Sequence, residues 1–138
     1  MEIINKYFDL VNEDKWEEAL PLIIEIIEMN PEISTSWFNY GVCLDALKQH
    51  DKAAGAFQQA YMLYLSKETE EDLQKSYGAE YRMCRSLLLA NMLDELFGYF
   101  KDKIEEDPEY LDIILNSTDD FQPLFNKKPF SDLLPLQQ

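Results

Sequence analysis

The chain has 138 residues, of which 27 are acidic and 12 basic, and its formal net charge is −15. This length suffices for one domain with a hydrophobic core. The negative charge argues against binding to nucleic acid or to an anionic membrane surface. We therefore expect a protein or peptide as the partner. Only four glycines are present, which favours helices over a sheet with many tight turns.

The first half of the chain predicts two pairs of antiparallel helices, at about residues 1–33 and 34–67. When the sequence is aligned with itself at an offset of 34 residues, core-type residues fall on other core-type residues. The aligned pairs are Ile3 with Trp37, Tyr7 with Gly41, Leu10 with Leu44, Ala19 with Ala53, Ile23 with Phe57, and Ile26 with Ala60. Because two helices alone cannot bury both of their faces, we expect the pairs to stack on one another.

Small residues inside the apolar stripes have a mechanical explanation in this stack. Gly41 has no Cβ, so it lets the second helix of its pair approach closely, and Ala53 offers a flat face for the same contact. Trp37 and Phe57 are large enough to fill the space between one pair and the next.

A third pair is predicted at about residues 77–110, with a longer spacing. A shift of 43 residues places Gly41 on Cys84 and Phe57 on Phe100, although Ala60 falls on Lys103. The nine additional residues fall near residues 66–76, where Thr69 followed by Asp72 predicts a helix N-cap. We expect a helix of about 20 residues, or ~30 Å, from near Glu70, with a polar loop as the alternative.

The last segment, about residues 109–138, does not continue the repeat pattern. Asp107 and Pro108 predict a helix start, followed by a short apolar face of Tyr110, Ile113 and Ile114. Three prolines then restrict the chain to short helical turns. The apolar side chains of these turns are expected to cap the last helix pair, or else to lie in a groove or on a second molecule; they are Phe121, Leu124, Phe125, Phe130, Leu133 and Leu134.

The 34-residue pattern resembles the tetratricopeptide repeat family. The resemblance is carried by Trp37, Gly41, Ala53, Phe57 and Ala60 in the second repeat, and by Ala19 and the closing Pro31 in the first. The chain departs from the family at Tyr7, Leu44 and Leu65, where Gly, Tyr and Pro are usual. The resemblance implies an all-α fold, a right-handed superhelical stack of antiparallel helix pairs, with about three repeats and a C-terminal cap in a single domain.

The resemblance also implies that the first helix of each repeat lines a groove for a peptide or a partner helix. The expected peptide-binding residues are Phe8, Phe38, Asn39, Val42, Tyr81, Arg82 and Arg85. Some family members clamp a terminal carboxylate, but Asn39 and Arg82 match only two of the five clamp positions. Pairing of the arginines with local acids such as Glu80 is the alternative interpretation.

Motifs for catalysis, metals and cofactors are not found. The single histidine, His50, is expected to be a solvated turn residue without an orienting partner, and Cys43 and Cys84 to be buried free thiols. No signal peptide or membrane-spanning run is recognised, so a cytoplasmic protein is expected. We therefore expect a non-enzymatic interaction module, or alternatively a small secretion-type chaperone that holds an unfolded export substrate; the oligomeric state stays open.

Overall fold

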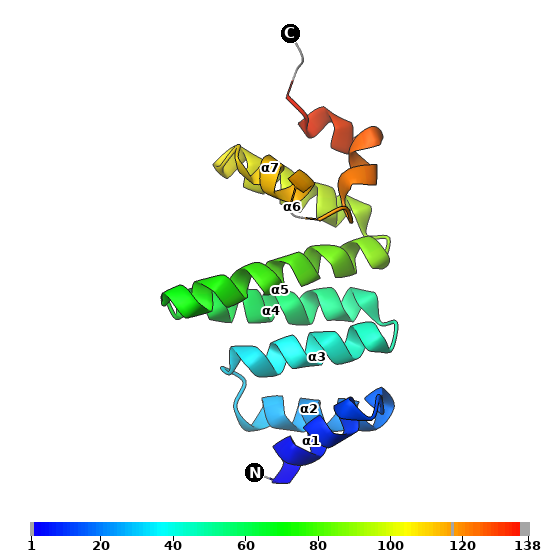
Figure 1. Ribbon diagram of the computed structural model, residues 1–138, viewed down its shortest axis with the longest axis vertical. Coiled ribbons are helices and arrows are strands. Elements are labelled where there is room, and N and C mark those ends of the chain that lie inside the picture. Colours follow the sequence, from blue (N-terminus) through cyan, green and yellow to red (C-terminus); the bar gives the residue numbers. More distant parts are fainter. Residues whose placement is uncertain (1, 117, 136–138) are drawn as a thin grey trace. The chain divides into compact units, whose positions relative to one another are not determined.

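The computed structural model describes residues 2–116 and 118–135, and all of its regular elements there are helices (Figure 1). The prediction of an all-α chain is thus confirmed for the described residues. No helix among them is both long and apolar enough to span a bilayer. The elements are α1 (Glu2–Asn12), α2 (Trp16–Met29), α3 (Ser34–Ala46), α4 (His50–Ser66), α5 (Glu70–Leu89), α6 (Leu93–Glu106), α7 (Tyr110–Asn116), and the 3-10 helices η1 (Gln122–Asn126) and η2 (Phe130–Leu133).

The chain divides into two compact units after Asn91. The first unit contains α1 to α5, and the second contains α6, α7 and the two 3-10 helices. The division separates α5 from α6, the two helices that correspond to the expected third pair.

The ends of the helices recur at the two spacings found in the sequence. Helix α1 ends at Asn12, α3 ends 34 residues later at Ala46, and α5 ends 43 residues after that at Leu89. The turns that follow each contain one residue with positive φ at the matching position, namely 59° at Asp14, 64° at Lys48 and 58° at Asn91. The same backbone turn therefore joins the first and second helix three times.

The additional residues of the third repeat lengthen α5, as predicted. Thr69 has an extended backbone, and its Oγ1 accepts a hydrogen bond from the Asp72 amide at 3.0 Å, so it caps the helix at the expected place. Helix α5 has 20 residues against 13 in α3. Figure 1 shows the α4–α5 end extending past α3 on the left side of the view.

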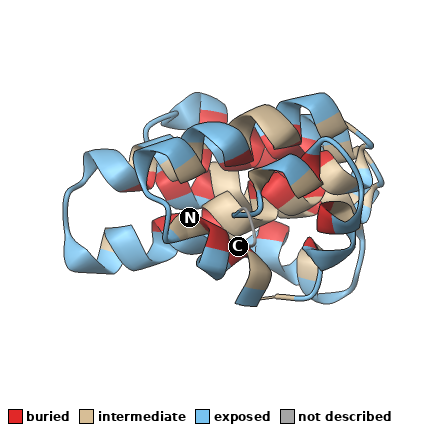
Figure 2. Ribbon diagram, turned by 90° about the horizontal axis from the view of Figure 1, so that it is seen from above, coloured by how far each residue is buried: buried red, intermediate tan, exposed pale blue. Residues whose placement is uncertain are grey.

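The close contact predicted at Gly41 is present. A Cβ added at Gly41 would lie 2.8 Å from two carbon atoms of the Phe57 ring, which is itself fully buried. Ala53 and Ala60, on either side of Phe57 along α4, are also completely buried. Figure 2 shows buried and exposed stretches alternating along the helices that are visible in this view, as expected for helices with one apolar face.

The second unit is built around Phe100 of α6. The rings of Phe121, Phe125 and Phe130 lie 5.3, 6.2 and 6.3 Å from it, measured between centroids, and all four side chains are buried. The apolar tail is therefore packed against α6, within short helical turns as the prolines predicted.

Helix α7 differs from its prediction in the face that it buries. It begins at Tyr110. In the turn just before this helix, the Asp107 carboxylate accepts a hydrogen bond from the Glu109 amide at 3.1 Å. Leu111 and Ile114 are buried, whereas Ile113 is 57% exposed, so the predicted place of Ile113 in the apolar face is wrong. Four of the five residues 110–114 are apolar, so the sequence pattern does not indicate which of them are buried. Packing within the second unit buries Leu111 and Ile114.

We predict that Gly41→Ala is destabilising, whereas Gly55→Ala in the adjoining helix is not. The added methyl at position 41 meets the Phe57 ring, and such overpacking costs about 1–3 kcal/mol. A Cβ at Gly55 would have no heavy atom within 4 Å, so the gain in helix propensity of about 0.5–1 kcal/mol remains. Urea unfolding followed by circular dichroism measures both free energies. Equal values would contradict the close contact.

We predict that Phe125→Ala costs about 3–5 kcal/mol or unfolds the second unit, because it leaves a cavity beside Phe100. Leu134→Ala, at a position 37% exposed, is the control and should change the unfolding free energy by less than about 0.5 kcal/mol. Removal of all residues after Asn116 should cause aggregation or a lower melting temperature. A soluble truncated chain with unchanged melting would show that the tail is dispensable.

Candidate binding surface

Three helices of the first unit contribute the expected groove residues, and α3 contacts both of the others. The Tyr7 hydroxyl of α1 lies 3.4 Å from the backbone oxygen of Asn39 in α3. On the other side, Arg82 of α5 contacts Phe38 of α3. Figure 1 shows α3 between α1 and α5. Helix α3 thus contacts both α1 and α5, and these three are the first helices of the expected repeats.

Phe38 and Arg82 form the central contact of this surface. The guanidinium carbon of Arg82 lies 5.9 Å from the centroid of the Phe38 ring, in cation–π geometry. Phe38 also contacts Phe57, whose ring lies edge-on to it with 5.3 Å between the ring centroids. Phe38 therefore packs partly against the core as well as lying among the expected groove residues.

The two arginines of α5 keep their charges available. Arg82 and Arg85 are both half-buried, and neither forms an ion pair with any residue in the described part of the chain. The alternative pairing with Glu80 is therefore not observed. In a chain of net charge −15, both cations are therefore without an acidic partner among the described residues, and Arg82 lies over the Phe38 ring.

The other expected residues lie around this contact or at the end of the surface. Asn39, Val42 and Tyr81 are half-buried. Phe8 of α1 is exposed, and its ring meets Tyr7 edge-on at 5.2 Å. The structure thus brings Phe38 and Arg82 into direct contact, and it connects Phe8 to the surface through Tyr7 and Asn39.

The structure contradicts the expectation for His50. This residue begins α4 and is half-buried, and its Nδ1 lies 2.9 Å from Oδ1 of Asp45. The Ser86 hydroxyl, which is completely buried, donates to the same carboxylate at 2.9 and 3.1 Å. His50 does have an orienting partner, in a polar cluster that links α3, α4 and α5.

This cluster lacks the order of a nucleophilic triad. A serine nucleophile needs a histidine that accepts its proton, with the carboxylate behind the histidine. Here the Ser86 hydroxyl points at the Asp45 carboxylate instead. The sequence signal was weak, since Ser86 lies 41 positions from Asp45. Among the described residues, no group of histidine, cysteine and acidic side chains is arranged to hold a metal ion.

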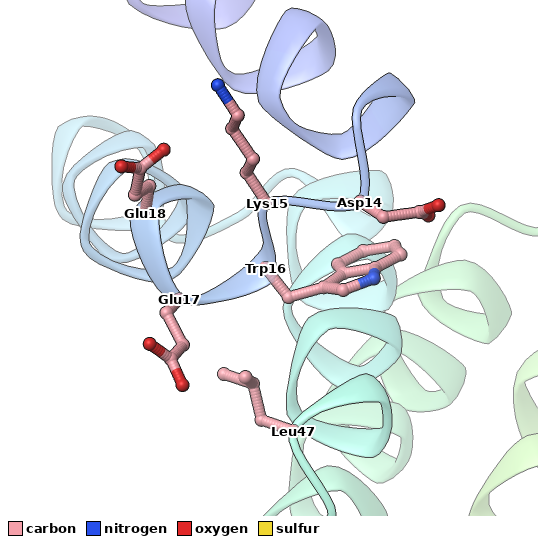
Figure 3. A pocket seen from close by; sticks show the side chains of 6 residues that line it. All are labelled: Asp14, Lys15, Trp16, Glu17, Glu18 and Leu47. Atoms are coloured by element: carbon pink, nitrogen blue, oxygen red, sulfur yellow. The ribbon is translucent and has the colours of Figure 1, made fainter.

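Two surface hollows lie away from the expected groove residues. Figure 3 shows the first, at the turn between α1 and α2, which is lined by Asp14, Lys15, Trp16, Glu17, Glu18 and Leu47. The second lies at the turn between α4 and α5 and is lined by Tyr64, Leu65, Glu68, Thr69, Glu70 and Leu73.

Comparison of the chain with protein-family models, with curated proteins and with solved structures finds no match. The inference of function therefore starts from the contacts and charges described above.

Two ionisable groups lie beneath the surface, at the contact of α1 with α3. Cys43 is a completely buried free thiol whose Sγ lies 3.4 Å from the Trp16 oxygen. Burial raises the pKa of Cys43 to about 11. Burial likewise raises the pKa of the Tyr7 hydroxyl far above its usual value, and the nearby Cys43 thiolate adds to this effect.

We predict an alkaline loss of stability that depends on Cys43. Folding raises the pKa of this thiol, so its contribution to stability is complete below the ordinary value of 9.0 and is lost as the pH rises through about 11. Urea unfolding of the wild type between pH 8 and about 10 should show the decline, and Cys43→Ala should show a smaller one. An identical decline in the variant would assign the effect to other groups.

Proposed function

We propose that this chain is a non-enzymatic interaction module that binds a peptide or helix of a partner protein on the face formed by α1, α3 and α5. The observation that carries the proposal is the pair of half-buried arginines on α5, without ion pairs in the described chain, one of them over the Phe38 ring. Aromatic and arginine side chains together are the usual composition of binding hot spots.

The architecture that we propose for this face is that of tetratricopeptide repeats, stacked as a right-handed superhelix. The helix ends that recur at 34 and 43 residues and the repeated positive-φ turn support it. So does the Gly41–Phe57 contact at the positions that carry the resemblance. In such a stack the first helices line the concave side, where an elongated segment contacts several repeats at once.

The chemistry of the surface favours a segment with both apolar and acidic character. Phe8, Val42 and Tyr81 provide apolar contact area, and Arg82 and Arg85 provide cations for a carboxylate. Arginine binds carboxylates through two parallel hydrogen bonds, which gives orientation as well as attraction. Nucleic acid does not fit, because a chain of net charge −15 repels phosphates.

A displayed library of random peptides tests this proposal without knowledge of the natural partner. Peptides selected on the immobilised protein are synthesised with a fluorophore, and their affinities are measured by fluorescence anisotropy. We expect them to carry acidic and apolar residues. Arg82→Glu and Arg85→Glu should each weaken binding about tenfold or more, because a charge that faces the ligand is reversed. Higher salt should weaken binding in part.

Lys48→Glu provides the matched control, because Lys48 is an exposed residue in the turn between α3 and α4. It makes the same change in net charge away from the expected groove residues. An equal loss of affinity in Lys48→Glu would contradict the proposed face. So would selected peptides whose binding does not respond to Arg82 or Arg85. Melting curves of each variant establish that it is folded.

A further inference from the structure

The hollow at the turn between α4 and α5 combines exposed leucines with acidic side chains. Leu65 and Leu73 line it and are 40% and 41% exposed, and Tyr64 lines it as a buried residue. Met62 lies three residues before Leu65, and Tyr77 lies four residues after Leu73. Both are more than half exposed, and these spacings place each on the same helix face as its leucine. We use the name α4–α5 tip for a set of six residues, which are Met62, Leu65, Leu73 and Tyr77 together with Glu68 and Glu70.

The tip exists because both helices are longer than α3. Helix α4 has 17 residues and α5 has 20, against 13 in α3, and Figure 1 shows the turn between α4 and α5 extending past α3. Leu65 and Leu73 line one hollow, and Met62 and Tyr77 lie about one turn away along each helix, so four exposed large apolar side chains occur near this turn, where soluble proteins commonly expose single ones. Their burial by a partner would be favourable, because it removes apolar area from water.

The charge around the leucines is negative on balance, because four acidic residues at positions 68 to 72 outnumber Lys67 and Lys75, and it restricts the occupant. Glu68 and Glu70 line the hollow, and Glu71 and Asp72 follow in the first turn of α5. Lys75, one turn along α5, is held by Glu71 at 3.2 Å. A second copy of this chain would bring like charges together at this place, and an RNA or an anionic lipid would be repelled.

We propose that the α4–α5 tip binds a basic amphipathic segment of a partner protein. An apolar side chain of the segment lies between Leu65 and Leu73, and lysine or arginine side chains on either side of it pair with Glu68 and Glu70. Leu73 precedes Arg82 by nine residues along α5, or about 14 Å of helix, and the tip requires the opposite charge in its ligand. Binding at the tip therefore does not depend on the function proposed above.

A short fluorescein-labelled peptide of leucine and lysine, spaced as an amphipathic helix, is the probe. The same composition in scrambled order is one control peptide, and a version with glutamate in place of lysine is the other. We expect saturable binding of the first peptide and weaker binding of both controls. Amide chemical-shift changes in the labelled protein should concentrate at residues 62–77.

Two double variants identify the site. Leu65→Ser with Leu73→Ser removes the apolar contact, and Glu68→Gln with Glu70→Gln removes the charges. Each should weaken binding about tenfold, because apolar anchors and facing charges both contribute to interface hot spots. The second pair should also reduce the dependence on salt. The matched controls lie on α2, where Met29→Ser and Glu25→Gln with Glu28→Gln change exposed residues of the same kinds. They should change affinity less than twofold.

Three outcomes would overturn the proposal. The first is an absence of saturable binding of the amphipathic peptide. The second is an equal loss of affinity in the α2 controls, which would show that net charge alone attracts the peptide. The third is self-association of the wild type that Leu65→Ser with Leu73→Ser abolishes, which would make a second copy the occupant. Unchanged melting of the tip variants establishes that any loss of binding is local.

Discussion

The approach of α4 to the backbone of α3 at Gly41 determines the positions of a series of side chains that extends from the core of the first unit to its surface. Because position 41 has no Cβ, the Phe57 ring occupies that space and is completely buried. Phe38 then meets Phe57 edge-on, and Arg82 lies over Phe38. A constraint on core packing thus extends through two aromatic rings to a cation on the surface. The residues proposed for binding are held in place by the core and not by a loop, which gives them a fixed geometry before any ligand arrives.

Much of this organisation could be read from the sequence, because it depends on periodicity and local capping. The spacings of 34 and 43 residues anticipated where the helices end, and Thr69 with Asp72 anticipated the start of α5. The face of α7 could not be read in this way, since residues 110–114 offer two apolar faces and packing within the unit chose Leu111 over Ile113. The place of Ser86 beside Asp45 was equally hidden, because only the stacking of α3 against α5 brings these two residues together, whereas His50 follows Asp45 by five residues.

The two proposed surfaces differ in the charge that they would select. The face with Arg82 and Arg85 is suited to acidic segments, whereas the α4–α5 tip is suited to basic ones. A partner that carries both kinds of segment on one chain could engage both surfaces, and the second contact would then be intramolecular, with a high effective concentration. Selectivity would follow from the order and spacing of the charged segments, since either segment alone would make only part of the contact.

The unequal extent of the helix contacts has a consequence for how the first unit opens. The contacts of α4 with α5 and of α3 with α4 are much more extensive than those of α1 with α2 and of α2 with α3. Local unfolding begins where contacts are fewest, and amide hydrogens in such regions exchange with solvent through partial opening. Helices α1 and α2 would therefore separate from α3 while α3, α4 and α5 remain folded. Such an opening uncovers the Cys43 thiol, so that its reaction with a solvent reagent would report a partly open form and not the unfolded chain.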